Sequence, residues 1–199
     1  MVKPRDRVDI TYFCIDIEAS GPIPALYNMV SIGVVPVVRE GGRWIPQRED
    51  LYLLLKPMND GFDPKAMAIH GITREEMERD GEEPKAAMER LREWTLAHCD
   101  PPAARPVFVG HNAVFDWAYV NYYFLALEEE NPFGWKALDT KALAMGRLGL
   151  QWFDTHKEML ARRLPALGPQ DPSLTHRADY DARYQAVILA ELLNLTPAL

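Results

Sequence analysis

The chain begins with strand patterns. Residues 9–17 form a nearly continuous apolar run, which is typical of a strand buried on both faces. Two further β-rich runs, at about residues 29–38 and 51–55, are separated by short turns, one of which contains Gly41 and Gly42. Three strands joined in this way predict an antiparallel meander.

From about residue 84 onward, helical patterns alternate with short strand patterns. Helices are expected where apolar residues recur every three or four positions and where proline marks a start or an end. The expected elements are helices at about 84–98, 113–128, 140–148 and 178–193, strands at 106–110 and 136–139, and a proline-rich loop at 165–172. With the meander, this order predicts an α/β fold in which a mixed sheet of about five strands is flanked by helices. No linker is visible, so we expect residues 1–199 to form a single domain with its core at about 9–194.

Composition fits a globular chain without disulfides. Its 199 residues are enough to bury a core, and no apolar run approaches the roughly 18 residues that a membrane span requires. The basic residues near the N-terminus are not followed by a secretory pattern. Cys14 and Cys99 stand in no metal-binding or redox spacing, so we expect small core residues in a reducing compartment. We predict a cytoplasmic protein with no membrane contact.

Charge is distributed unevenly along the chain. The net charge is −7, but residues 1–135 carry 14 basic and 22 acidic side chains, whereas residues 136–199 carry 8 and 7. A phosphate-binding surface would therefore draw on the last third of the chain. The candidates, each of which fits a solvated helix face equally well, are Arg147, Lys157, Arg162, Arg163, Arg177 and Arg183.

Two Asp-x-Glu pairs occur in the sequence. Asp16 and Glu18 lie at the end of the first strand pattern, where residues two apart point to the same face and can converge on one site. Ionised carboxylates beside an apolar strand are unfavourable unless they are paired or bind a metal. Asp80 and Glu82 instead flank Gly81 in an acidic turn. We expect the first pair to carry chemistry and the second to be solvated.

Further acidic residues lie where two later helices begin. Asp116 falls in the first turns after the strand at 106–110, with Asn112 as the candidate N-cap, and Asp181 follows His176 at the start of the last helix. Each alone also fits an ordinary aspartate near a helix N-terminus or an exposed loop histidine. Together, four carboxylates and a histidine suit phosphodiester hydrolysis, in which carboxylates hold two divalent ions about 4 Å apart and an imidazole accepts a proton.

Three segments resemble the three exonuclease motifs of the DnaQ-like DEDDh superfamily, which includes RNase T, oligoribonuclease and the proofreading subunit of bacterial DNA polymerase III. They are Asp16-Ile17-Glu18-Ala19-Ser20-Gly21, Gly110-His111-Asn112-Ala113-Val114-Phe115-Asp116 and His176-Arg177-Ala178-Asp179-Tyr180-Asp181-Ala182. The resemblance spans residues 12–190 in the right order, and residues 69–73 and 138–140 resemble secondary signatures of the group.

The resemblance implies a ribonuclease H-like fold and a metal-dependent 3′-5′ exonuclease. Such an enzyme hydrolyses single-stranded RNA or DNA from the 3′ end to nucleoside 5′-monophosphates. The resemblance also implies that His176 is the general base. The ligands that it implies for two Mg²⁺ or Mn²⁺ ions are Asp16, Glu18, Asp116 and Asp181.

Two residues compete for these roles. His111 also stands five residues before an aspartate, but the group assigns it no base role, so we expect a structural one. Asp179 competes with Asp181 as a ligand, but the His-x-Ala-x-x-Asp spacing favours Asp181 and leaves Asp179 exposed.

Contacts with the single-stranded 3′ end are expected from residues around the motifs. The resemblance places the backbone of Ala19 and Ser20 beside the terminal nucleotide. The side chains expected to bind the terminal bases, each of which also fits core or loop packing, are Tyr27, Met29, His70, Asn112 and Phe115. The aromatic residues at 117–124 have helical spacing and better fit a core face. Some relatives are homodimers, and the sequence is compatible with that state.

Two alternatives use the same fold. A catalytically idle nucleic-acid-binding module would be expected to have lost a carboxylate or the histidine, and none is lost here. A phosphodiesterase acting on a small nucleotide is mildly favoured by the acidic net charge, and turnover of dinucleotides against longer strands would distinguish it. The sequence leaves RNA and DNA open, because the sugar is read by contacts that the motifs do not define.

Overall fold

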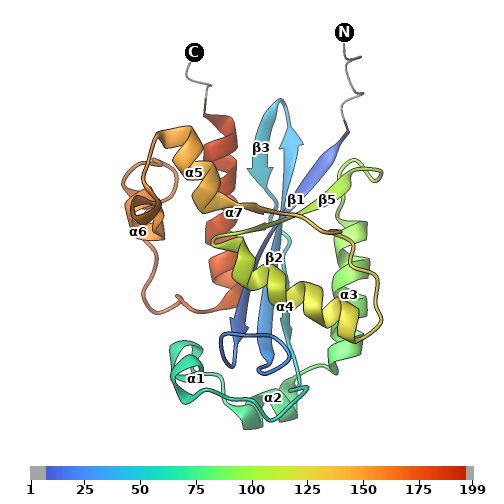
Figure 1. Ribbon diagram of the computed structural model, residues 1–199. Coiled ribbons are helices and arrows are strands. Elements are labelled where there is room, and N and C mark those ends of the chain that lie inside the picture. Colours follow the sequence, from blue (N-terminus) through green and yellow to red (C-terminus); the bar gives the residue numbers. More distant parts are fainter. Residues whose placement is uncertain (1–7, 196–199) are drawn as a thin grey trace.

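The structure is a computed structural model, and it describes residues 8–195. A mixed sheet runs through the centre of the protein (Figure 1). The strands are β1 (Ile10–Ala19), β2 (Met29–Glu40), β3 (Arg43–Pro46), β4 (Leu51–Leu54), β5 (Arg105–Gly110) and β6 (Ala137–Asp139). Their order is β3-β2-β1-β5-β6, with β4 also paired to β2; β1 is antiparallel to β2 and parallel to β5. The predicted α/β fold is confirmed. Over the described residues the sheet has six strands rather than about five, because the chain forms β3 directly after the turn at Gly41 and Gly42.

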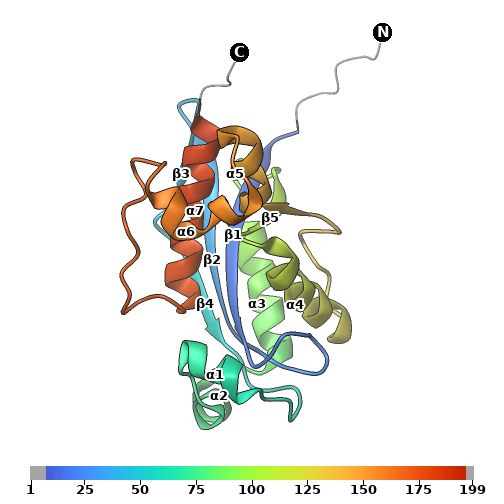
Figure 2. The ribbon, with the colours of Figure 1, turned by 60° about the vertical axis from the view of Figure 1, so that its left-hand side comes forward.

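Helices cover both faces of this sheet (Figures 1 and 2). Helices α3 (Pro84–Ala97) and α4 (Ala113–Ala126) lie on one face, and α7 (Ala178–Asn194) lies on the other. Helices α5 (Thr140–Leu148) and α6 (Lys157–Ala161) share a small apolar core with α7. The short helices α1 (Pro64–His70) and α2 (Arg74–Asp80) lie at the end of the molecule toward which β1 runs, at the bottom of Figure 1.

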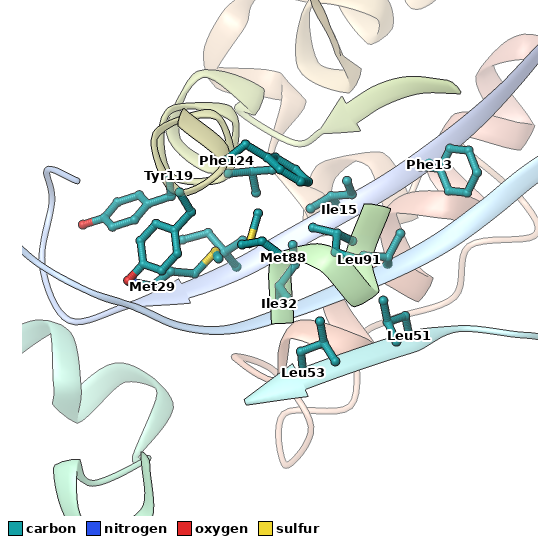
Figure 3. Packing of buried hydrophobic residues seen from close by; sticks show 14 of the residues in the cluster. Phe13, Ile15, Met29, Ile32, Leu51, Leu53, Met88, Leu91, Tyr119 and Phe124 are labelled. Carbon is teal, nitrogen blue, oxygen red and sulfur yellow. The ribbon is translucent and has the colours of Figure 1, made fainter. Parts of the chain in front are cut away.

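The side chains of β1 alternate between two cores. Phe13 and Ile15 face the main core, which lies between the sheet and helices α3 and α4 (Figure 3). Cys14 faces the smaller core beneath α7. Because successive side chains of a strand point to opposite faces, Asp16 and Glu18 fall on the same side as Cys14. The predicted two-sided burial is therefore confirmed, and it turns both carboxylates toward α7.

Helix α4 supplies three aromatic residues of the main core. Tyr119, Tyr123 and Phe124 are fully buried. The hydroxyl of Tyr119 donates to the carbonyl of Gly21 (2.7 Å), and the hydroxyl of Tyr123 accepts from the backbone N–H of Met29 (2.8 Å). The core role predicted for this aromatic segment is confirmed. These two hydrogen bonds also fix both ends of the loop that joins β1 to β2.

Two other expectations concern the whole chain. Cys14 and Cys99 are both buried and form no disulfide, as their spacing predicted. Among residues 8–195, no helix has the length and apolar character needed to cross a membrane.

The sequence patterns did not predict the short helices. Helices α1, α2 and α6 and the 3₁₀ turn η1 (Trp152–Thr155) contain four to seven residues each, which is too few for an apolar period to repeat. The signals present were caps: Asp63 accepts from the N–H of Lys65, and Thr73 forms a capping box with Glu76.

Asn112 occupies the N-cap position of α4, as the sequence suggested, but the capping hydrogen bond comes from another residue. Asn112 has a left-handed backbone (φ 73°), and its side chain makes no capping hydrogen bond. The first N–H of α4, on Ala113, instead donates to Oδ2 of Asp139 (2.9 Å), whose Oδ1 accepts from the N–H of Lys141 (2.7 Å). One carboxylate at the end of β6 therefore caps the first turns of both α4 and α5.

Candidate active site

The four candidate carboxylates and His176 line one cavity of about 780 Å³. Glu18, His176 and Asp181 each offer a ligand atom within 4.8 Å of the other two. Asp16 and Asp116 line the same cavity. Three segments that are far apart in the sequence therefore meet in one place.

A glycine in β2 lets the last helix reach this cavity. Gly33 pairs with Asp16 across the sheet. A Cβ atom on Gly33 would lie 2.1 Å from the carbonyl oxygen of Ala178, so only glycine allows the first turn of α7 to rest on the strand. This close approach brings Asp181, which lies three residues further along α7, to the carboxylate of Asp16.

A second close approach positions Asp116. A Cβ atom on Gly110 would lie 2.8 Å from the Cα of Ala113, so the glycine at the end of β5 allows α4 to begin directly against the strand. Asp116 is 5% exposed, and its Oδ1 accepts from the backbone N–H of Ile17 (3.0 Å). This hydrogen bond holds α4 to β1 between Asp16 and Glu18.

The carboxylates repel one another in a buried setting. Burial raises the pKa of Asp16 well above its ordinary value; Lys157 opposes this shift, and the neighbouring carboxylates add to it. Burial, with Asp181 and Asp116 contributing, raises the pKa of Glu18 to about 8. Burial also raises the pKa of Asp116 to about 7. Such a group of carboxylates is stabilised by a cation.

One cationic side chain of the protein lies among these carboxylates. The ammonium of Lys157 donates to Oδ1 of Asp181 and lies 3.8 Å from Oδ1 of Asp16. A set of closely spaced carboxylate oxygens that already attracts an ammonium group fits hard divalent cations, which prefer oxygen ligands. The donor set therefore fits the metal ions that the motifs imply.

Two glutamines beside the carboxylates were not predicted. Gln185, which is 1% exposed, donates from Nε2 to Oδ1 of Asp16 (2.5 Å). Gln170 donates from Nε2 to Oδ1 of Asp181 (3.0 Å). Gln185 stands four residues after Asp181, on the same helix face, and that spacing is a signal that the sequence offered. Gln170 lies in the proline-rich loop, where no periodic pattern marks it.

The six basic candidates separate into two groups. Lys157 and Arg162 line the cavity. Arg147 and Arg183 donate to backbone carbonyls elsewhere, and Arg177 pairs with Asp179 (2.9 Å). Arg163 is exposed and does not line the cavity. The cationic side chains that face the cavity therefore come from α6 and the residue that follows it.

The two competing residues are held by other groups. Nδ1 of His111 is hydrogen-bonded to the hydroxyl of Thr140 (2.8 Å), and burial, followed by the nearby cations, lowers its pKa to about 3. Asp179 pairs with Arg177 and does not line the cavity. Its side chain is 26% exposed, so it is half-buried rather than exposed as predicted.

Two of the candidate nucleotide contacts are engaged within the protein. Met29 is fully buried in the main core, so its side chain is not free to stack on a base (Figure 3). The backbone N–H of Ser20 donates to the carbonyl of Asn28 (2.8 Å), and the carbonyl of Ser20 accepts from the N–H of Asp63 (2.7 Å). The backbone of Ser20 is therefore already hydrogen-bonded within the loop.

The other candidate contacts differ in their access. Phe115 and Asn112 line the cavity. Ala19 is 8% exposed, at the end of β1. Tyr27, which lies against Gly21, and His70, which accepts at Nδ1 from the N–H of Ile72 (3.1 Å), do not line the cavity.

Known structures share this fold. Escherichia coli ExoI, solved with single-stranded DNA and zinc, is 22% identical and has a TM-score of 0.70; the match covers 93% of this chain and 40% of the ExoI chain. The nuclease domain of 3′hExo, described as a DEDDh family member bound to rAMP, is 13% identical with a TM-score of 0.74 and 94% of each chain covered. These likenesses show that the chain has the ribonuclease H-like fold of these exonucleases.

Sequence comparison gives the family. The Exonuclease family, represented by RNase T, matches residues 13–189. The 3′-5′ DNA exonuclease Cap18 of Escherichia coli is 36% identical over 175 residues, which cover 88% of this chain and 87% of Cap18. The chain belongs to this exonuclease family and is a 3′-5′ exonuclease acting on nucleic acid.

The second Asp-x-Glu pair provides a control prediction. Asp80 pairs with Arg79 (2.6 Å) and Glu82 with Arg90 (2.5 Å), both outside the cavity. Asp80→Ala with Glu82→Ala is expected to leave exonuclease activity within about twofold of wild type, because surface substitutions change energies little. The measurement is the initial rate on a labelled oligonucleotide. A large loss of rate would show that we assigned the catalytic role to the wrong Asp-x-Glu pair.

Proposed function

We propose that the protein hydrolyses single-stranded DNA from its 3′ end and releases nucleoside 5′-monophosphates. The observation that carries this proposal is the meeting of four carboxylates and His176 in one cavity. The choice of DNA is supported by Cap18, which is named as a DNA exonuclease and shares 36% of its aligned residues with this chain.

We assign the binding of two Mg²⁺ or Mn²⁺ ions to Asp16, Glu18, Asp116 and Asp181. Bound divalent ions of this kind stabilise the charge that develops on the attacking and leaving oxygens. The chain contributes the geometry: β1 presents the first two carboxylates on one face, and α4 and α7 bring the other two against it. Hydrogen bonds from Gln185 and Gln170 orient two of these side chains.

His176 is assigned as the general base. Its side chain is exposed at the cavity, and its backbone N–H donates to Oδ2 of Asp181 (2.8 Å), which fixes the start of the side chain. The imidazole takes a proton as the oxygen of water bonds to phosphorus. The bond from phosphorus to the 3′ oxygen of the preceding nucleotide breaks, and that oxygen gains a proton from solvent. The products are a 5′-monophosphate and a strand shorter by one nucleotide.

A time course with 5′-end-labelled strands tests this function. Single-stranded DNA and RNA of equal sequence are incubated with Mg²⁺, Mn²⁺ or EDTA, and the products are resolved by length. We expect a ladder that shortens from the 3′ end, faster for DNA and absent in EDTA. Faster shortening of the RNA would overturn the choice of DNA, and an intact strand in every metal would overturn hydrolysis of polymers.

Gln185 provides a prediction about metal affinity. Gln185→Leu removes the hydrogen bond to Asp16 and should weaken Mn²⁺ binding by about 10-fold or more, the usual effect of losing a group that orients a ligand. The Mn²⁺ dissociation constant is measured by electron paramagnetic resonance. The matched control is Gln47→Leu, because Gln47 bonds Glu40 at the surface. Wild-type affinity in the Gln185 variant would contradict this role.

A further inference from the structure

A second hollow continues from the active-site cavity, toward α5 and η1. It measures about 470 Å³ and shares His111, Lys157 and Gln170 with the cavity. Its own walls include Lys141 from the first turn of α5 and Trp152 and His156 from the segment around η1. We call this hollow the α5–α6 groove. Because the two hollows share His111, Lys157 and Gln170, a chain held at the carboxylates can reach the groove.

The groove contains a lysine in an unusual setting. Lys141 is 6% exposed, and no carboxylate oxygen lies within ion-pair distance of its ammonium among residues 8–195. Lysine is almost never so buried without a partner. Its Nζ lies over the ring of Trp152, 4.6 Å from the centroid. The ammonium is therefore held by an aromatic ring rather than neutralised by an acid.

Two lysines line the groove, although the protein is acidic. Beyond burial, the groups that lower the pKa of His111 are Lys157, Lys141 and His156. One acidic side chain, Glu158, also lines the groove. Lys157 is bonded to Asp181, so Lys141 is the lysine of this wall that no acidic side chain pairs with among residues 8–195. A wall of this kind attracts polyanions.

The groove also offers an aromatic surface. Trp152 is 41% exposed, a large exposure for an indole. Because Lys141 lies over one face of the ring, a base stacked on Trp152 would use the other face. Stacking of bases on aromatic side chains beside a cationic groove is a general mode of binding single strands without reading their sequence.

We propose that the α5–α6 groove binds the substrate strand on the 5′ side of the scissile phosphodiester, with Lys141 facing a backbone phosphate and Trp152 stacking on a base. This inference rests on the proposed function, since it needs a polymeric substrate. The cavity holds the bond that is cut, and the rest of the strand must leave it through an opening. The groove provides that opening, with charge and aromatic surface that complement a single strand.

Trp152→Ala tests the stacking contact by binding alone. The probes are fluorescent phosphorothioate oligodeoxynucleotides of two and ten nucleotides, which resist hydrolysis, and fluorescence anisotropy in Ca²⁺ gives their dissociation constants. The ratio of the affinity for the long probe to the affinity for the short probe should be lower in the variant than in the wild type, on the order of tenfold. Trp135→Ala is the matched control, because Trp135 is 79% exposed and lines neither hollow, and it should keep the wild-type ratio. An unchanged ratio in Trp152→Ala, or equal loss for both probes, would overturn the groove.

Lys141→Met tests the phosphate contact while keeping the length of the side chain. The slope of log Kd against log salt for the ten-nucleotide probe should decrease by about 0.7, the value for one phosphate contact on a single strand. An unchanged slope in a variant with a wild-type circular dichroism spectrum would overturn this contact. Both measurements detect binding, so they remain decisive even if the labelled-strand time course shows no hydrolysis.

Discussion

Asp16→Asn is expected to lower kcat by roughly 10³-fold or more while raising the melting temperature of the metal-free protein. A carboxylate that holds divalent ions supplies several kcal/mol of transition-state stabilisation, and each 1.36 kcal/mol is about tenfold in rate. In the metal-free protein the same carboxylate is unfavourable, because burial raises its pKa well above the ordinary value and neighbouring carboxylates add to this. A neutral amide of the same shape removes that repulsion, so the melting temperature should rise by about 2–4 °C near pH 8 in EDTA.

The matched control for this variant is Asp60→Asn. The side chain of Asp60 is 92% exposed and pairs with Arg74 at the surface, so its loss should change neither quantity appreciably. The two readouts are the steady-state rate on single-stranded DNA and a thermal melt in EDTA. A variant of Asp16 that keeps wild-type activity, or that melts below wild type without metal, would contradict the assignment of this carboxylate.

His176→Ala is expected to lower kcat by about 10²-fold or more while leaving Mn²⁺ binding close to wild type. The magnitude is that of general-base catalysis, in which a positioned imidazole accepts the proton from the attacking water. The side chain is exposed and belongs to none of the three apolar cores, so its removal leaves no cavity in them. The rate is measured under single-turnover conditions, which report the chemical step, and Mn²⁺ binding is measured in the same samples.

His98→Ala is the control for loss of a histidine. His98 stacks on Trp94 at the end of α3 (ring centroids 4.0 Å apart), away from the cavity. That variant should keep the wild-type rate. A His176 variant that turns over at a near-normal rate would remove the histidine from the mechanism, and the general base would have to be sought elsewhere.

Part of this site follows from local sequence. The unbroken apolar run of β1 predicts burial on both faces, and the two-residue period then places Asp16 and Glu18 on one side. The residues that allow the remaining carboxylates to approach were less visible. Gly33 and Gly110 look like ordinary strand residues in the sequence, and their role appears when the helices that touch them are in place.

Other parts depend on tertiary packing alone. Lys157 lies in a helix of five residues, which shows no apolar period, and its contact with Asp181 comes from how α6 sits beside α7. Met29 could be read as a base-stacking residue because it is apolar and close to the first motif. Its burial follows from α3 and α4 covering that face of the sheet, which the local pattern around residue 29 does not encode.

Mn²⁺ binding measured by electron paramagnetic resonance tests the central claim most directly. The claim is that four carboxylates from three separate segments form one centre for two divalent ions. We predict that the wild-type chain binds two Mn²⁺ ions and that Asp16→Asn binds fewer or binds them much more weakly, while Asp60→Asn binds as wild type does. Full binding of two ions by the Asp16 variant, or no Mn²⁺ bound by the wild-type chain, would contradict the account.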